Sequence, residues 1–176
     1  MATNWKLDPT HSELQFKVKH LMITTVTGHF TSFNVDATTE GEDFTKGANV
    51  NVTADVNTIS TNNEQRDGHL KSPDFFDAAN NAEIKFTSTK MEGSGEDYKL
   101  TGDLTIKGAT KPVTLTVEYG GIVVDPYGQT KAGFTVSGKI SRKEFGLTWS
   151  AVTEAGQVVV SDEIKIHAEI QLVKQA

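Results

Sequence analysis

Apolar and polar residues alternate along most of this chain, which is the pattern of a strand with one buried face. Over 13–19, Leu14, Phe16 and Val18 share one face, and polar or charged side chains occupy the positions between them. Comparable runs recur to the end of the chain, separated by short polar or glycine-containing segments. The pattern predicts eight strands, at about 13–19, 25–38, 48–59, 84–91, 98–106, 113–119, 132–140 and 158–173.

The second predicted strand changes phase within its length. Its apolar positions shift by one residue near Thr31 and Ser32, which indicates a β-bulge at that point. Turn-forming residues or missing periodicity mark the irregular connections. Such segments are expected at 5–12, which leads into the first strand, and at 41–47 and 148–156.

Eight one-sided antiparallel strands bury their apolar faces best by closing into a barrel, which also removes the sheet edges. The fold expected for 1–176 is therefore all-β, a single domain with one eight-stranded antiparallel barrel. Its outward positions are polar, so the barrel is not expected to sit in a membrane. The interior of an eight-stranded barrel is either filled by side chains or holds one small ligand, and inward residue size alone leaves the two alternatives even.

Segment 66–77 interrupts the alternation and carries the adjacent pair Phe75 and Phe76. Ser72-Pro73-Asp74 predicts a helix start, with Ser at the N-cap and Pro at the first helical position. Short helical inserts are expected at about 62–77 and 141–147. The first insert is expected to close or line one end of the barrel. One phenylalanine of the pair is then core, and which of the two meets a ligand stays open.

Composition excludes several classes of function. The formal charge of −6 and the absence of a basic stripe argue against nucleic acid, which is bound through Lys and Arg. The chain has no Cys, which excludes disulfides and thiol chemistry. No apolar run approaches the ~20 residues of a membrane-spanning helix. The first residues lack an apolar signal region, so the expected location is cytoplasmic, or periplasmic or secreted if a leader has been removed.

Inward positions supply the candidate binding residues. If the barrel is hollow they line it, and if it is filled they are core, which alternation cannot distinguish. These candidates are Phe16, Val18, Phe30, Phe33, Val52, Val56, Phe75, Phe76, Phe86, Leu104, Leu115, Val117, Phe134, Val136 and Ile166.

Polar residues near the irregular segments form a second set of candidates: Asp8, His11, Asp67, His69 and Arg142. A charge-assisted network that ties the inserts to the barrel, including an Arg–Asp pair, is the favoured role, and head-group recognition is second. A hydrolase based on the neighbouring Asp, His and Ser of 8–12 lacks a nucleophile elbow and carries little weight. The five histidines follow no metal-binding spacing. No catalytic residue, metal or cofactor is expected, apart from a bound lipid.

Four separated motifs occur in a fixed order along the chain, and together they are specific where each alone would not be. They are Trp5-x-Leu7-Asp8-x-x-His11-Ser12; Arg66-Asp67-x-His69-Leu70-x-Ser72-x-Asp74-Phe75-Phe76-Asp77; Gly102-Asp103-Leu104-Thr105-Ile106-Lys107-Gly108-x-x-Lys111-Pro112-Val113; and Ser141-Arg142-x-x-Phe145-Gly146-Leu147.

With these motifs the chain closely resembles the YceI-like family of bacterial polyisoprenoid-binding proteins, over nearly its whole length. The resemblance implies an extended lipocalin-like barrel with a hydrophobic tunnel and no catalytic residues. It also implies a long-chain amphiphile as ligand, such as an isoprenoid quinone or a fatty-acid derivative, bound for transport, storage or sequestration. Dimers are common in the family, so a homodimer is a further expectation. The alternatives are a filled barrel acting as a stress-associated interaction module and, with less weight, a lipid-modifying hydrolase.

Overall fold

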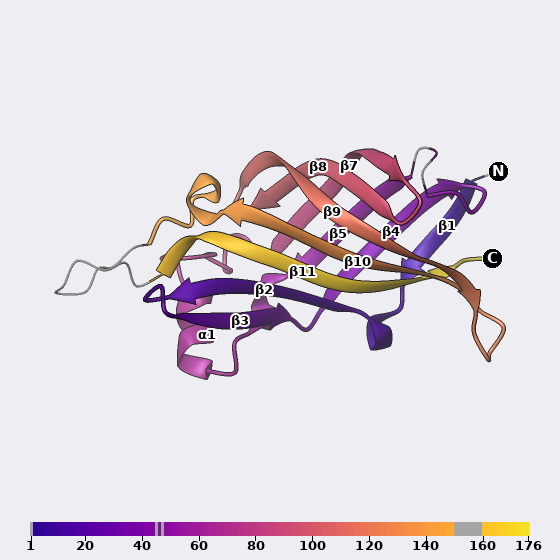
Figure 1. The fold of residues 1–176 in the computed structure, drawn as a ribbon. Helices are drawn as coiled ribbons and strands as arrows, with labels where there is room; N and C mark the ends of the chain where they lie inside the picture. The colour runs from indigo at the N-terminus through magenta and orange to yellow at the C-terminus, as the bar shows by residue number, and fades with distance from the viewer. Residues whose placement is uncertain (1, 45, 47, 150–159) are drawn as a thin grey trace.

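The protein is a closed antiparallel β-barrel (Figure 1). The computed structural model describes residues 2–44, 46, 48–149 and 160–176. The sheet closes because β1 pairs with β4 on one side and with β11 on the other. The strands are β1 (Ala2–Leu7), β2 (Glu13–His20), β3 (Thr24–Phe30), β4 (Phe33–Glu40), β5 (Asn49–Asp55), β6 (Ile59–Ser60), β7 (Glu83–Ser94), β8 (Asp97–Ile106), β9 (Ala109–Val124), β10 (Thr130–Ser141) and β11 (Val160–Lys174).

The eleven strand segments make eight barrel strands, because three of the eight are each interrupted once. The 3-10 turn η1 (Pro9–His11) separates β1 from β2, and η2 (Val56–Thr58) separates β5 from β6. Thr31 and Ser32 separate β3 from β4. The halves of the interrupted strands stay in step with one another, since β1 pairs with β4 and β2 with β3, while β5 pairs with β4 and β6 with β3. On the other side β5 pairs with β7 but β6 does not.

The predicted closed barrel of eight strands is confirmed, with two corrections in its first half. The first strand begins at Ala2, so only the end of 5–12 is irregular. The expected bulge at Thr31 and Ser32 is a full break in the strand. There the backbone hydrogen-bonds to the η2 turn, with Thr31 N donating to Thr58 O and Asp55 N donating to Ser32 O. This break accounts for the one-residue shift of the apolar positions in the sequence.

The insert after β6 contains the helix α1 (Glu64–Lys71), whose N-cap is Asn63. Ser72 ends this helix and does not begin another, so the predicted helix start at Ser72 was wrong. Its hydroxyl and its N–H both donate to His69 O, and Pro73 then prevents the helix from continuing. A Ser-Pro pair fits the end of a helix as well as its beginning, and the sequence pattern does not separate the two. Residues after Pro73 form turns.

The second helical insert was predicted correctly. It is the 3-10 helix η3 (Arg142–Phe145), which ends at Gly146 with a φ of 78°. Such a left-handed backbone strains residues other than glycine. The loop expected at 148–156 and the start of the last strand at 158 fall largely on residues 150–159, which lie outside the described residues.

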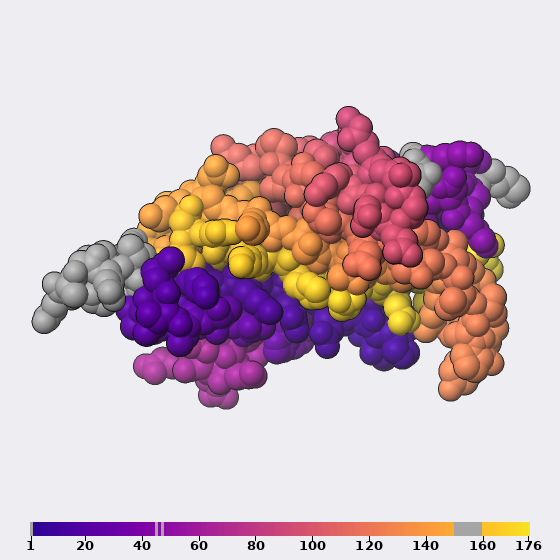
Figure 2. Space-filling view, in the orientation of Figure 1, coloured from indigo at the N-terminus to yellow at the C-terminus, as the bar shows by residue number. Residues whose placement is uncertain are grey.

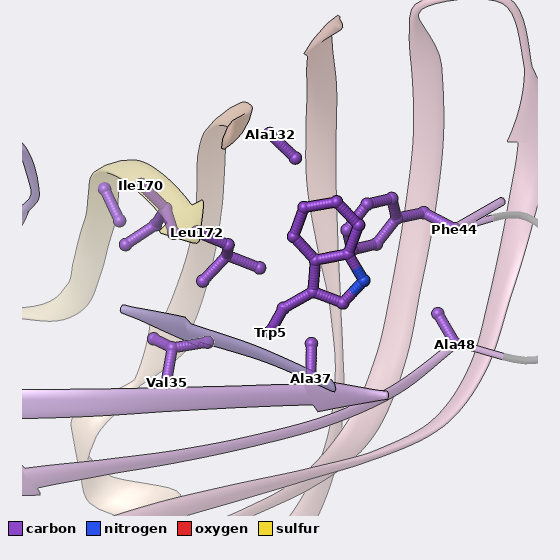
Figure 3. Packing of buried hydrophobic residues seen from close by; sticks show 9 residues of the cluster. Trp5, Val35, Ala37, Phe44, Ala48, Ala132, Ile170 and Leu172 are labelled. Atoms are coloured by element: carbon purple, nitrogen blue, oxygen red, sulfur yellow. The ribbon is translucent and has the colours of Figure 1, made fainter. Parts of the chain in front are cut away.

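One end of the barrel is closed by a packed aromatic cluster, next to both termini (Figures 1 and 3). The Trp5 side chain is 1% exposed and its ring centroid lies 4.9 Å from that of Phe44. The indole N–H donates to Thr39 Oγ1 at 2.9 Å, so the polar atom of this buried ring is satisfied. Ala132 and Leu172 pack against the same ring cluster. Side chains therefore fill this end of the barrel.

Candidate functional site

An apolar cavity of about 250 Å³ lies inside the barrel. Every strand except β1 and the two-residue β6, together with both helical inserts, contributes to its wall. The wall residues that the structure describes are hydrophobic apart from Gln15 and Arg142. Such a site can hold an apolar group by exclusion of water, with few directional contacts.

The structure brings nearly all the predicted lining residues to this wall. Val56 is the exception, because the chain has already turned into η2 there and its N–H donates to Ala82 O at 2.9 Å. The wall includes Phe16, Val18, Phe30, Phe33, Val52, Phe75, Phe76, Phe86, Leu104, Leu115, Val117, Phe134, Val136 and Ile166.

Three inward glycines explain how large side chains and a cavity coexist. A Cβ atom on Gly28 would overlap the ring of Phe16, which lies directly opposite on the neighbouring strand. Gly102 is covered in the same way by the Phe86 ring, and Gly138 by Leu115. The large side chains thus lean along the wall over the glycines, which leaves space nearer the barrel axis.

Sequence reasoning missed Phe44, which lies in the 41–47 connection yet is 4% exposed and lines the cavity. Its ring contacts Trp5 and meets Phe134 edge-on at 4.9 Å between centroids. Alternation cannot detect such a residue, because it lies outside any strand. A lone large aromatic residue in a polar, glycine-containing segment was the only available signal.

The Phe75–Phe76 segment covers a gap in the sheet between β6 and β7, which do not pair with each other. Phe76 meets Phe30 edge-on at 6.4 Å between ring centroids. Phe75 is buried against His69 and Trp149, with centroid distances of 5.0 and 5.3 Å. Both phenylalanines also lie on the cavity wall, so the insert serves as both barrel wall and core.

The predicted polar residues fall into separate groups. Asp8 lies near the β9–β10 hairpin, where its carboxylate accepts hydrogen bonds from Lys131 Nζ at 2.6 Å and contacts His11 Nδ1 at 2.9 Å. Lys131 also lies 3.5 Å from Asp125. The hydrogen bond from Lys131 holds the pKa of Asp8 well below its usual range and raises the pKa of Lys131. This group ties η1 to the start of β10.

Asp67 holds the start of the α1 insert in place. Its carboxylate accepts hydrogen bonds from the N–H and the hydroxyl of Thr61, at 2.8 and 2.5 Å. Arg66 donates to the same residue, to Thr61 Oγ1 and Thr61 O. His69 Nε2 lies 2.9 Å from Asp74 Oδ2, on the exposed side of the insert. These contacts are internal to the segment 61–74.

Arg142 is 2% exposed and lies on the cavity wall. Its guanidinium donates to four backbone carbonyls, those of Leu147, Trp149, Val160 and Ser161, at 2.6 to 3.2 Å. Burial lowers its pKa, and the nearby charge of Asp162 opposes that shift. The expected Arg–Asp pairing was wrong for Arg142, because its donors are used by carbonyls and not by a carboxylate.

The residues at 8–12 do not form a hydrolytic arrangement. The Ser12 hydroxyl exchanges hydrogen bonds with the backbone of Gln171, while His11 contacts Asp8 and Thr10. Over the described residues no group of three or more His, Asp or Glu side chains could hold a metal ion. Within the same residues, no helix is long and apolar enough to cross a membrane.

Comparison with known proteins places the chain in a family. The YceI-like domain model matches residues 5–172. A UPF0312 protein of Staphylococcus epidermidis is 36% identical over 172 residues, covering 96% of each chain. The crystal structure of a Campylobacter jejuni YceI protein superimposes with a TM-score of 0.77 at 33% identity, covering 97% of both chains. A polyisoprenoid binding domain from Saccharophagus degradans shares the fold, with a TM-score of 0.68 at 17% identity, covering 97% of this chain and 98% of that one. The chain therefore belongs to the YceI family.

Proposed function

We propose that this barrel binds the apolar part of a long-chain amphiphile, such as a polyisoprenoid, an isoprenoid quinone or a fatty-acid derivative. The observation that carries the proposal is the apolar cavity of about 250 Å³ behind a closed barrel end. The Saccharophagus degradans domain of the same fold is polyisoprenoid binding. That ligand class is extended to this chain as part of the proposal.

The cavity volume sets the expected affinity. At about 30 Å³ for each water-sized unit, 250 Å³ holds on the order of eight methylene-sized groups. Burying eight such groups contributes about 6 kcal/mol at ~0.8 kcal/mol each. Association costs at least about 4 kcal/mol, so a short tail binds weakly and a longer one needs further contacts outside the cavity.

The composition of the wall also indicates which part of the ligand the cavity recognises. Arg142 is the one charged residue among the described wall residues, and it already donates to four carbonyls, so it has little left to offer a charged head group. Recognition then rests on the tail, with the polar end of the ligand outside the cavity. This suits carriage, storage or sequestration of a lipid without chemical change.

The test is organic extraction of the purified protein followed by mass spectrometry, together with binding of saturated fatty acids of increasing length. We expect a bound amphiphile, and an affinity that rises about fourfold per methylene up to roughly eight carbons and more slowly beyond. An extract without amphiphile, and no shift in melting temperature with fatty acids, prenols or quinones, would contradict the proposal.

A matched pair of variants locates the site. Val136→Trp adds an apolar ring to the cavity wall, while Val123→Trp adds the same ring at a position that is 63% exposed on the β9–β10 hairpin. We expect the first to weaken binding by at least about tenfold and the second to leave it unchanged. Equal binding by both variants would place the ligand elsewhere.

A further inference from the structure

The turn between β2 and β3 carries three apolar residues, Leu21, Met22 and Ile23, at the barrel end opposite the termini (Figure 1). Met22 is 58% exposed and Ile23 is 76% exposed. Leu21 and Met22 have φ angles of 53° and 60°, the left-handed region that hairpin turns usually fill with Gly or Asn. The exposed side chains of Met22 and Ile23 contribute little to the core, and a left-handed backbone strains large residues, which points to a role outside the chain.

A row of lysines lies behind this tip on the outer face of the barrel. Lys17 in β2 is directly opposite Lys165 in β11, which is directly opposite Lys139 in β10. Like charges at facing positions destabilise a sheet. Within the part of the chain that the structure describes, Lys17 and Lys165 form no ion pair, and Lys139 lies 3.3 Å from Glu163. The chain is acidic overall, so this basic row stands out from its surroundings.

The acidic residues of the same region do not cancel the row. The row and its neighbour Lys19 carry four positive charges, on Lys17, Lys19, Lys139 and Lys165, against two negative charges on Asp162 and Glu163, the partner of Lys139. Lys19 is exposed between the row and the tip. Counted over the residues that the structure describes, the outer surface next to the tip therefore carries a net positive charge.

The tip also adjoins the cavity. Val160 lies on the cavity wall and pairs with His20, the residue that precedes the tip. The opposite end is sealed by Trp5 and Phe44. In the space-filling view the β2–β3 hairpin lies beside the first residues of β11 at this end (Figure 2). A ligand tail leaving the cavity on this side would emerge beside the exposed apolar turn.

We infer that the 21–23 tip docks on a lipid membrane surface that carries anionic head groups. The spacing fits, because Lys19 and Lys17 lie two and four residues behind the tip, about 7 and 13 Å along the strand. The head-group layer is about 5 to 8 Å deep on each side of a bilayer, so an inserted tip brings Lys19 to the level of the phosphates. Lys17 then lies about 5 Å outside that layer, within the Debye length of about 8 Å over which it still attracts anionic head groups. The inference goes beyond ligand binding, since it names the surface from which the barrel takes or delivers its ligand.

The experiment is flotation of the purified protein with vesicles of phosphatidylcholine alone, or of phosphatidylcholine and phosphatidylglycerol at roughly 7:3. We expect binding to the anionic vesicles, little binding to the neutral ones, and release as salt rises from about 0.1 to about 1 M. Met22→Ser with Ile23→Ser should weaken binding by at least about tenfold. Lys17→Gln and Lys165→Gln should each weaken it about fivefold.

The β9–β10 hairpin offers a matched control, because Val123 and Val124 are 63% and 68% exposed at the other end of the barrel. Val123→Ser with Val124→Ser should leave vesicle binding unchanged. Absence of binding to anionic vesicles, or an equal loss in both double variants, would overturn the inference. So would a lower oligomeric mass of the tip variant in solution, because a second copy of the chain would then be what covers the tip.

Failure of this inference can be told apart from failure of the proposed function. The tip variant should still bind a fatty acid added from ethanol, because it leaves the cavity wall unchanged. Val136→Trp should still float with anionic vesicles although it no longer binds the tail.

Discussion

Replacing Arg142 by Met tests whether this buried cation holds the second insert to the barrel. Its guanidinium joins Leu147, at the end of the insert, and Trp149, just after it, to Val160 and Ser161 at the start of β11. Met has a similar length but no donor, so the substitution removes all four hydrogen bonds without opening a large cavity. The folded barrel is expected to survive the change with reduced stability.

The size of the effect follows from two opposing contributions. Four hydrogen bonds to a charged group, at about 1.5 kcal/mol each, contribute about 6 kcal/mol. Removing the cation also removes its desolvation penalty, which in buried ion pairs offsets several kcal/mol. We therefore expect a net loss of about 3 kcal/mol in the free energy of unfolding. Arg142→Lys keeps the charge, but an ammonium group cannot donate to all four carbonyls, so this variant should be less stable than the wild type and more stable than Arg142→Met.

Urea unfolding followed by fluorescence measures this directly. With a slope of roughly 2 kcal/mol per molar urea, the midpoint should fall by about 1.5 M with the slope unchanged. Lys143→Met is the matched control, because Lys143 is the next residue of η3 and is exposed. It should change stability by less than about 0.5 kcal/mol. A loss below about 1 kcal/mol in Arg142→Met would show that the four carbonyls find other partners, and would refute this role for Arg142.

Three further predictions concern other parts of the barrel. Lys131 depresses the pKa of Asp8, and a carboxylate with a depressed pKa stabilises the fold above pH ~4 and loses its contribution as the pH falls. The urea midpoint of the wild type should therefore drop more steeply from pH 5 to 2 than that of Asp8→Asn, and parallel curves for the two proteins would contradict this. Gly28→Ala should push the Phe16 ring toward the cavity, costing about 1–3 kcal/mol and weakening fatty-acid binding, whereas unchanged melting temperature and affinity would disprove the packing argument. Asn63→Ala should cost about 1 kcal/mol and speed amide exchange in α1 but not in β8; exchange that rises equally in both would argue against a local cap.

Much of the fold could be predicted from the sequence because a two-residue period reports directly which face of a strand is buried. The same period failed for β1, where only Trp5 is fully buried and the apolar positions are too few to form a pattern. It also failed at Thr31 and Ser32, where a break and a bulge produce the same change of phase. Ser72 was misplaced because its side chain caps either end of a helix. In each case the deciding contact is with a residue distant in sequence or with the local backbone.

The residues of the cavity wall were predictable from the sequence, but the shape of the cavity was not. Alternation identifies Phe16 and Gly28 as inward, yet whether they fill the barrel depends on the direction in which the ring leans. That direction follows from their register, which places the two residues directly opposite each other. Phe44 lies outside any strand and therefore left no periodic signal. For the polar residues, sequence proximity was misleading, because Asp8 and Arg142 each find partners more than a dozen residues away.

The two ends of the barrel are built with different kinds of contact, and this difference bears on how a lipid could enter. The end near the termini is held by aromatic packing around Trp5 and by the Asp8–Lys131 contact. The other end is closed by inserts, and α1 has no fully buried residue. Segments with few buried apolar contacts open at a lower free energy than core strands. If the barrel binds the proposed tail, opening of α1 would cost less free energy than separating paired strands, so this end is the expected side of entry, while the packed end keeps the barrel folded.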